Sequence, residues 1–214
     1  VNSSIIENCV ICSATKMVRE PIYPTQSPAT KRNHTLWSDT VAYGKSGPWW
    51  QIIVDGYSAY IWIYFLKRKS DATYSLIRHI EMIENEYGDK VVEIRMDFGE
   101  LITTELQNYC KSKIPSIAFK PAPAHVKELD GLSERNIRTI KQMARAMLKQ
   151  SGLPSNIQFK HYAHLYAATV KNRVVHSRTG TIPLVAYTGK MNDLASIHTF
   201  GTLVSIYIPE SERV

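Results

Sequence analysis

The chain has 214 residues, 44% of them hydrophobic, which is enough to bury one large core or two small ones. It contains no long uncharged apolar run, so we expect no membrane association. Lys and Arg number 26 against 19 for Asp and Glu, and the isoelectric point is about 9.3, which favours a polyanionic partner such as nucleic acid. Three cysteines are too few for a secreted disulfide framework, so we expect a reducing, intracellular setting.

The N-terminal segment, residues 1–32, is rich in Ser, Pro and Thr and shows little periodicity. This composition predicts a linker or the tail of a preceding domain. The chain opens on Val1 without a charged and then apolar leader, and we expect it to be a fragment of a longer precursor.

Three strands are predicted next, over 35–43, 50–55 and 60–66. The pair Asp55-Gly56 is a turn signal, and residues 60–65 read Tyr, Ile, Trp, Ile, Tyr, Phe, a composition typical of a strand. Together they predict an antiparallel meander of three strands.

A helix should begin after Ser70 and end at Gly88, which suits a left-handed C-terminal residue. Its apolar positions fall at helical spacing and are Tyr74, Ile77, Ile80, Ile83 and Tyr87. Short strands are predicted over 91–96 and 114–120, on either side of a helix over 101–113.

Two long helices follow, over 130–150 and 156–173, separated by Gly152 and Pro154. On one side the second helix shows Phe159, Tyr162, Ala163, Tyr166 and Val170. This element order predicts an α/β protein of the ribonuclease H-like fold, with a five-stranded mixed sheet flanked by helices.

Three acids occupy positions that meet in this fold. Asp39 lies inside the first strand, Asp97 ends the fourth, and Glu134 lies in the first turn of the long helix. Phosphoryl transfer with two divalent ions needs converging carboxylates, because hard cations take oxygen ligands. A carboxylate within an apolar strand is costly unless a metal ion offsets it. The alternative is that these acids are ordinary turn or capping residues.

The long helix has two contrasting faces. Glu134, Arg138, Lys141 and Arg145 fall on one stripe, and the opposite stripe contains Ile137, Ile140, Ala144, Met147 and Leu148. A basic row beside a catalytic carboxylate can hold phosphates with little sequence preference. We therefore predict that Arg135, Arg138, Lys141 and Arg145 bind DNA; the alternative is an ordinary solvated face.

Several strings carry a family resemblance. Residues 55–59 read Asp-Gly-Tyr-Ser-Ala, residues 95–99 read Arg-Met-Asp-Phe-Gly, and residues 131–135 read Gly-Leu-Ser-Glu-Arg. Further matching strings occur at 143–148 and at 172–173. In this order the strings resemble the catalytic core of copia-type retrotransposon integrases, and they correspond to that family's Asp-Asp-Tyr-Ser-Arg, Arg-x-Asp-Asn-Gly and Asn-Gly-x-x-Glu-Arg motifs.

The resemblance implies a retroviral integrase type of core in which Asp39, Asp97 and Glu134 hold two Mg²⁺ or Mn²⁺ ions. It implies double-stranded DNA as the partner, self-association, and action in the nucleus after assembly in cytoplasmic particles. It also identifies Cys9 and Cys12 as half of a His-His-Cys-Cys zinc site. Only eight residues precede Cys9, so we expect the Zn²⁺ site to be incomplete in this sequence.

The implied organisation has three parts. Residues 1–33 would be the end of the zinc-binding domain and a linker, residues 34–175 the catalytic core, and residues 176–214 a C-terminal extension of the core.

The sequence departs from the family pattern beside the acids. Phe98 replaces an Asn, Glu100 is displaced by one residue, the loop 126–131 differs from Pro-Gln-x-Asn-Gly, and Gly47-Pro48 lies later than expected. These changes leave the three acids in place.

The sequence thus supports an integrase that processes 3′ ends and transfers strands. The alternative is a catalytically inactive, integrase-derived DNA-binding protein, which the altered loops favour. A ribonuclease or Holliday-junction nuclease on the same fold fits the acids but not the strings after Glu134.

Overall fold

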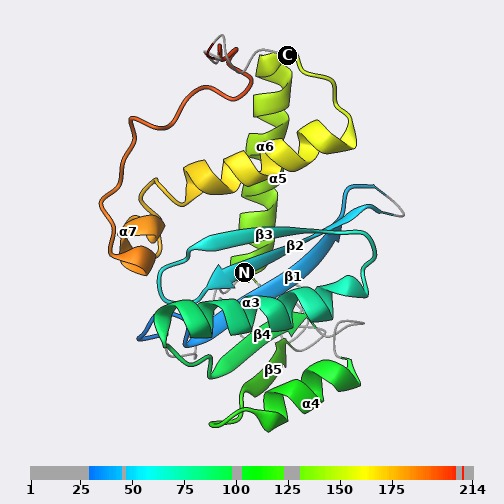
Figure 1. Ribbon diagram of the computed structural model, residues 1–214, viewed down its shortest axis with the longest axis vertical. Helices are drawn as coiled ribbons and strands as arrows, with labels where there is room; N and C mark the ends of the chain where they lie inside the picture. The colour runs from blue at the N-terminus through cyan, green and yellow to red at the C-terminus, as the bar shows by residue number, and fades with distance from the viewer. Residues whose placement is uncertain (1–28, 45–46, 98–102, 123–130, 206–208, 210–214) are drawn as a thin grey trace, which may run out of the picture.

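A computed structural model of the chain describes residues 29–44, 47–97, 103–122, 131–205 and 209. Its centre is a five-stranded sheet in the order β3-β2-β1-β4-β5 (Figure 1). The strands are β1 (Thr35–Ala42), β2 (Trp49–Asp55), β3 (Ile61–Leu66), β4 (Glu93–Asp97) and β5 (Ala118–Ala122). The first three pair antiparallel, whereas β4 runs parallel to β1 and β5 parallel to β4. The predicted five-stranded mixed sheet is confirmed.

Five helices are described: α3 (Asp71–Tyr87), α4 (Thr104–Ser112), α5 (Gly131–Ser151), α6 (Ile157–Lys171) and α7 (Pro183–Thr188). The long helix α5 extends past the sheet, and α6 packs against it (Figure 1). Across the described residues, no helix has both the length and the apolar character that a membrane span requires.

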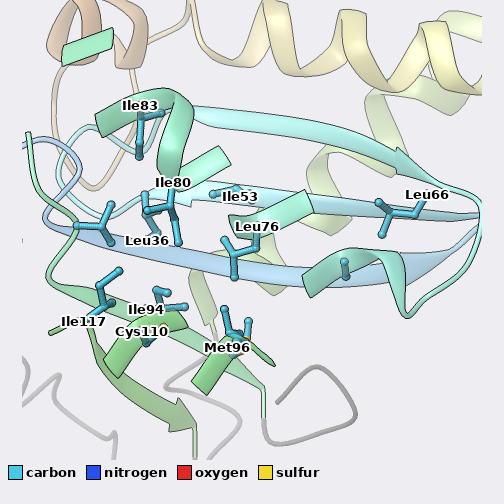
Figure 2. Close-up of a cluster of buried hydrophobic side chains, with 13 residues drawn as sticks. Leu36, Ile53, Leu66, Leu76, Ile80, Ile83, Ile94, Met96, Cys110 and Ile117 are labelled. Atoms are coloured by element: carbon cyan, nitrogen blue, oxygen red, sulfur yellow. The ribbon is translucent and has the colours of Figure 1, made fainter. Parts of the chain in front are cut away.

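The sheet has a hydrophobic core on each face. On one face, Leu36 of β1 and Ile94 of β4 pack with residues of α3 and α4, including Leu76, Ile80 and Cys110 (Figure 2). On the other face, residues of β1, β2 and β3 pack with α5 and α6 and include Trp37, Trp50, Ile52, Ile137, Ile140 and Ala167. The run Ile52–Ile53–Val54 is therefore buried on both faces, which is why it lacks the apolar–polar alternation of a one-sided strand.

The predicted strand over 114–120 is displaced, because β5 begins at Ala118 and continues through Pro121. Residues before it are used to connect the strand to α4, and the Ile117 N–H donates to the Cys110 carbonyl. A strand at the edge of a sheet tolerates proline because its outer N–H groups have no ladder partner.

Two aromatic residues that fall at the predicted helical spacing are exposed in the structure. Tyr74 of α3 is 58% exposed, and Tyr162 of α6 is 52% exposed. The buried residues of α6 are Ala163, His164, Ala167 and Ala168. Small side chains let α6 approach α5 and the sheet closely, and the larger aromatic residue is turned outward. Periodicity indicated a helix here but did not identify the face that packs.

Helix α7, which the sequence did not predict, joins the C-terminal part of the chain to the start of β1. Tyr187 is buried, and its hydroxyl donates to Asn33 Oδ1 at 2.7 Å. Arg32 donates to Asp89 Oδ2 at 2.7 Å and lies 4.3 Å from the centre of the Tyr87 ring. The hydrogen bond from Tyr187 to Asn33 ties residues 183–188 to the core. The three-part division of the chain stays a prediction.

Two buried polar side chains hold the ends of the strands. Asp55 accepts hydrogen bonds from the Asn33 N–H at 2.9 Å and the Ser58 N–H at 2.7 Å, and these oppose the rise that burial causes in its pKa. Asn172, which follows α6, accepts from the Ile61 N–H and donates to the Ile61 carbonyl, both at 2.9 Å. These side chains replace ladder bonds that the backbone lacks at these points.

We predict that Asn172→Ala destabilises the protein by about 2 to 4 kcal/mol, because it leaves two buried backbone groups of Ile61 without partners. Urea unfolding measures this change. Asn85→Ala, at an exposed position in α3, is the matched control and should change stability by less than about 0.5 kcal/mol. Equal effects of the two substitutions would contradict the structural role of Asn172.

Because His79 of α3 is buried, we predict that the free energy of unfolding falls as the pH is lowered. His79 is buried between Tyr64 and Trp62, and burial lowers its pKa to about 3 from 6.5. Between pH 7 and 5 the unfolded chain gains a proton that the folded chain does not, so stability present at pH 7 is lost as the pH falls. This group alone should remove about 2 kcal/mol over that interval.

Urea unfolding at both pH values tests this expectation, with His79→Leu as the variant. The drop in stability between pH 7 and 5 should be about 2 kcal/mol smaller in the variant than in the unsubstituted protein. His198→Leu, at an exposed position, is the control. An unchanged drop in the His79 variant would show that this histidine also titrates in the folded state.

Candidate active site and nucleic-acid interface

Asp39 lies in the middle of the sheet, opposite Ile52 of β2. Side chains alternate between the faces of a strand, so Asp39 shares the face of Trp37, which packs with α5. The carboxylate is half-buried, and its Oδ1 accepts the Thr40 N–H at 2.6 Å. The structure thus places an acid on the α5 side of the central strand.

Asp97 is the last residue of β4, the strand beside β1. The two strands are parallel and pair Ser38 with Met96, so one residue further along each strand comes Asp39 on β1 and Asp97 on β4. Adjacent strands lie roughly 4.8 Å apart. The backbones of the two acids are therefore neighbours at the same level of the sheet, while the side chain of Asp97 lies outside the described part.

Glu134 is exposed in the first turn of α5. The helix packs on the sheet through Ile137 and Ile140, which are buried against the strands. Among the side chains that the structure describes, no three His, Cys, Asp or Glu residues form a metal-binding group. Because Asp97 is not among those side chains, convergence of the three acids stays a prediction.

Other predicted features lie outside the described residues. These are the zinc half site at Cys9 and Cys12, and the altered loop positions Phe98, Glu100 and 126–130.

The two predicted faces of α5 are present. Ile137, Ile140 and Ala144 are buried, whereas Arg135, Arg138 and Arg145 are exposed. The apolar stripe faces the sheet and the three arginines are exposed, whereas Lys141 of the basic stripe is half-buried. That orientation leaves the stripe accessible, and its DNA-binding role stays a prediction.

Lys141 connects the basic stripe to the acid on β1. It is half-buried, and burial and the nearby Arg145 lower its pKa, while the charge of Asp39 acts in the opposite direction. The ammonium therefore lies within electrostatic reach of both groups.

A cleft that the sequence did not predict lies between α5 and α6, and we call it the α5–α6 cleft. Its volume is about 650 Å³, and four cations line it: Lys141, Arg145, Lys149 and Lys160. Lys149 could have been found from its spacing of four residues after Arg145. Nothing local in the sequence relates Lys160 to them, because it comes from a different helix.

The two histidines of α6 are packing residues. His164 contacts the rings of Tyr43 and Trp50, with its Nδ1 2.7 Å from the Lys160 carbonyl oxygen. His161 stacks on Phe65 with the ring centres 3.9 Å apart. Burial lowers the pKa of both, so both are neutral at pH 7 and add no charge to the cleft.

Comparison with curated proteins finds relatives among transposon polyproteins. The chain is 27% identical over 162 residues to the retrovirus-related Pol polyprotein from transposon TNT 1-94 of Nicotiana tabacum, covering 75% of this chain and 12% of that protein. It is 27% identical over 139 residues to the polyprotein from transposon RE2 of Arabidopsis thaliana, covering 65% of this chain and 9% of that protein. The chain thus spans about a tenth of the length of these relatives. No protein-family model matches it.

Solved structures share the fold at low sequence identity. The HTLV-2 integrase catalytic core domain in complex with magnesium, in its trimeric form, aligns with a TM-score of 0.53 and 21% identity over 72% of this chain and 96% of that one. A chain from the structure of the simian T-cell lymphotropic virus intasome in complex with PP2A regulatory subunit B56 gamma gives a TM-score of 0.58 and 17% identity, over 86% and 64% of the two chains. The ribonuclease H-like fold of integrase catalytic cores is therefore shown.

Proposed function

This chain is homologous to the Pol polyproteins of copia-type plant retrotransposons and has the fold of an integrase catalytic core, and we propose that it is a metal-dependent polynucleotidyl transferase. The reactions proposed are trimming of the 3′ ends of element DNA and transfer of those ends into target DNA. One observation carries the proposal: β1 and β4 bring Asp39 and Asp97 to the same level of the sheet, on the strand pair next to a basic helix.

The proposed metal ligands are Asp39, Asp97 and Glu134. Three carboxylates provide the oxygen donors that Mg²⁺ and Mn²⁺ prefer, and a half-buried acid in an apolar strand fits a site where a cation offsets its charge. A magnesium complex of the HTLV-2 core supports this choice of ion. Two bound ions would activate the attacking hydroxyl or water and stabilise the leaving oxygen.

Basic side chains of α5 would bind the DNA. Arg135 and Arg138 follow Glu134 directly on α5 and are exposed, so they can bind phosphates next to the reacting group. Lys141, close to Asp39, would hold a phosphate oxygen between the acid and the open basic face. Positioning of this kind keeps the nucleophile and the scissile bond in line without a covalent protein intermediate.

The proposal extends to assembly and location. We propose a homo-oligomer, since joining two DNA ends requires at least two active sites, and the structural neighbours include dimeric and trimeric forms and an intasome. We also propose that Cys9 and Cys12 complete a Zn²⁺ site with histidines upstream in a longer chain, and that the enzyme acts in the nucleus after particle assembly in the cytoplasm.

The second candidate is a DNA-binding protein that has lost catalysis. The observation that favours it is Phe98, an apolar side chain immediately after the second proposed ligand, where integrases of this kind have a polar Asn. In that protein the basic stripe would keep its DNA affinity while the acids would hold no metal.

Amide substitutions separate the two candidates. We predict that Asp39→Asn and Asp97→Asn each abolish Mg²⁺ or Mn²⁺ binding in titration calorimetry and reduce strand transfer by roughly 100-fold or more, because a neutral amide replaces one of the negative charges that hold the cations. Asp193→Asn, at an exposed position after α7, is the control and should leave both unchanged.

Full activity in either variant would overturn the assignment of the acids. An unsubstituted protein that binds DNA but no metal would identify the inactive DNA-binding protein. Metal-dependent cleavage of an RNA–DNA hybrid, without joining of DNA ends, would identify a nuclease on the same fold.

Salt dependence tests the basic stripe. We predict that Arg135→Gln/Arg138→Gln lowers the slope of log affinity against log salt by about 1.8, since each phosphate that the protein no longer neutralises lowers the slope by about 0.9. The matched control is Arg68→Gln/Arg78→Gln, which removes the same charge beside and within α3, on the other face of the sheet. A slope that changes equally in both double variants would show only a general effect of net charge.

A further inference from the structure

The α5–α6 cleft concentrates positive charge. The last part of β1 contributes Ala42 and Tyr43, the C-terminal half of α5 contributes Lys141, Arg145 and Lys149, and α6 contributes Lys160. No Asp or Glu is among the described residues that line it. Four cations thus face a hollow of about 650 Å³ with no carboxylate in its wall.

This arrangement is unfavourable in the free protein. Burial and then Arg145 lower the pKa of Lys141, against the opposing charge of Asp39, and burial followed by smaller effects that include the charges of Lys141 and Lys160 lowers the pKa of His164. Like charges held together repel, and a bound anion removes that cost. Tyr43 also lines the cleft, and its buried hydroxyl has no hydrogen-bond partner among the described residues.

The cleft is continuous with the basic stripe because Lys141 and Arg145 belong to both. From Glu134 to Lys149 the helix rises by roughly 22 Å, at 1.5 Å per residue. Each base pair of a DNA duplex adds about 3.4 Å along its axis, so the row is as long as about six base pairs of a duplex that lies along the helix. The cleft begins at Lys141, which feels the charge of Asp39, and reaches Lys149 at the end of the row furthest from Glu134.

We propose that the α5–α6 cleft binds the phosphate backbone of the substrate DNA to one side of the reacting phosphate, with Lys149, roughly 22 Å along α5 from Glu134, and Lys160 as positioning residues. The inference rests on the proposed function, which supplies DNA as the ligand and Glu134 as the starting point. Its consequence is a second point of attachment. A duplex held at the acids and at the cleft is fixed in direction along α5, whereas contacts beside Glu134 alone would leave it free to pivot.

The test compares Lys149→Gln/Lys160→Gln with Lys111→Gln/Lys190→Gln, which removes the same charge at exposed positions in α4 and after α7. Affinity for a duplex of about 20 base pairs is measured by fluorescence anisotropy across a salt series, without divalent metal. The cleft variant should lose about 1.8 from the salt slope, so between 50 and 200 mM salt the unsubstituted protein loses about tenfold more affinity than the variant. The control should keep the full slope.

Strand-transfer kinetics give a second readout. Removal of a positioning residue should raise the DNA concentration needed for half-maximal rate and leave kcat within about twofold, because the cleft does not touch the reacting atoms. Urea unfolding checks that both double variants are folded. If Lys160→Gln destabilises the protein, Lys149→Gln alone, at an exposed position, should lower the slope by about half as much.

An unchanged slope in the cleft variant, or an equal decrease in the control, overturns the inference. If Lys149→Gln/Lys160→Gln abolished binding of pyrophosphate but left the salt slope for duplex DNA unchanged, the cleft would be a small-anion site. That result would also overturn the inference. Failure of the proposed function would give a different result. The protein would then neither bind metal nor transfer strands, but its metal-free DNA binding would still lose salt dependence when Lys149 and Lys160 are substituted.

Discussion

The parallel pairing of β1 with β4 is the constraint on which the candidate site depends. The two strands are separated in sequence by a hairpin and by α3, and their register puts Ser38 opposite Met96, so that Asp39 and Asp97 follow as neighbours. Residue type alone would not bring the acids together. A shift of one residue would turn one of them to the opposite face of the sheet. Both cores, which bury Leu36 on one side and Trp37 on the other, hold the register in place.

The orientation of α5 on the sheet decides which of its side chains are available for the proposed DNA binding. Ile137, Ile140 and Ala144 fix one side of the helix against the strands, and the basic residues must then face outward. Lys141 lies where the two meet, within reach of the charge of Asp39. The same apolar contacts that stabilise the fold therefore set the direction in which the proposed DNA substrate would lie. The α5–α6 cleft extends that direction beyond the sheet.

Several residues that resemble family motifs act in the fold. Asp55 anchors the turn between β2 and β3 by accepting the Asn33 and Ser58 N–H groups, and Asn172 pairs with both backbone groups of Ile61. The motif strings thus contain both candidate catalytic residues and residues that stabilise the fold. The hydrogen bonds in the structure show which residues belong to the second group. The distinction matters for variants, since Asn172→Ala would reduce activity through unfolding.

The sequence by itself determined the order of strands and helices as far as α6, the position of Asp39 within a strand, and the two faces of α5, because these follow from local periodicity and turn residues. Tertiary structure decided what depends on distant partners. It turned Tyr162 outward, since Ala163 and Ala167 allow closer packing, and it docked Tyr187 on Asn33. It also brought Lys160 to the cations of α5, because helix packing sets which side chains meet and no local pattern encodes that meeting.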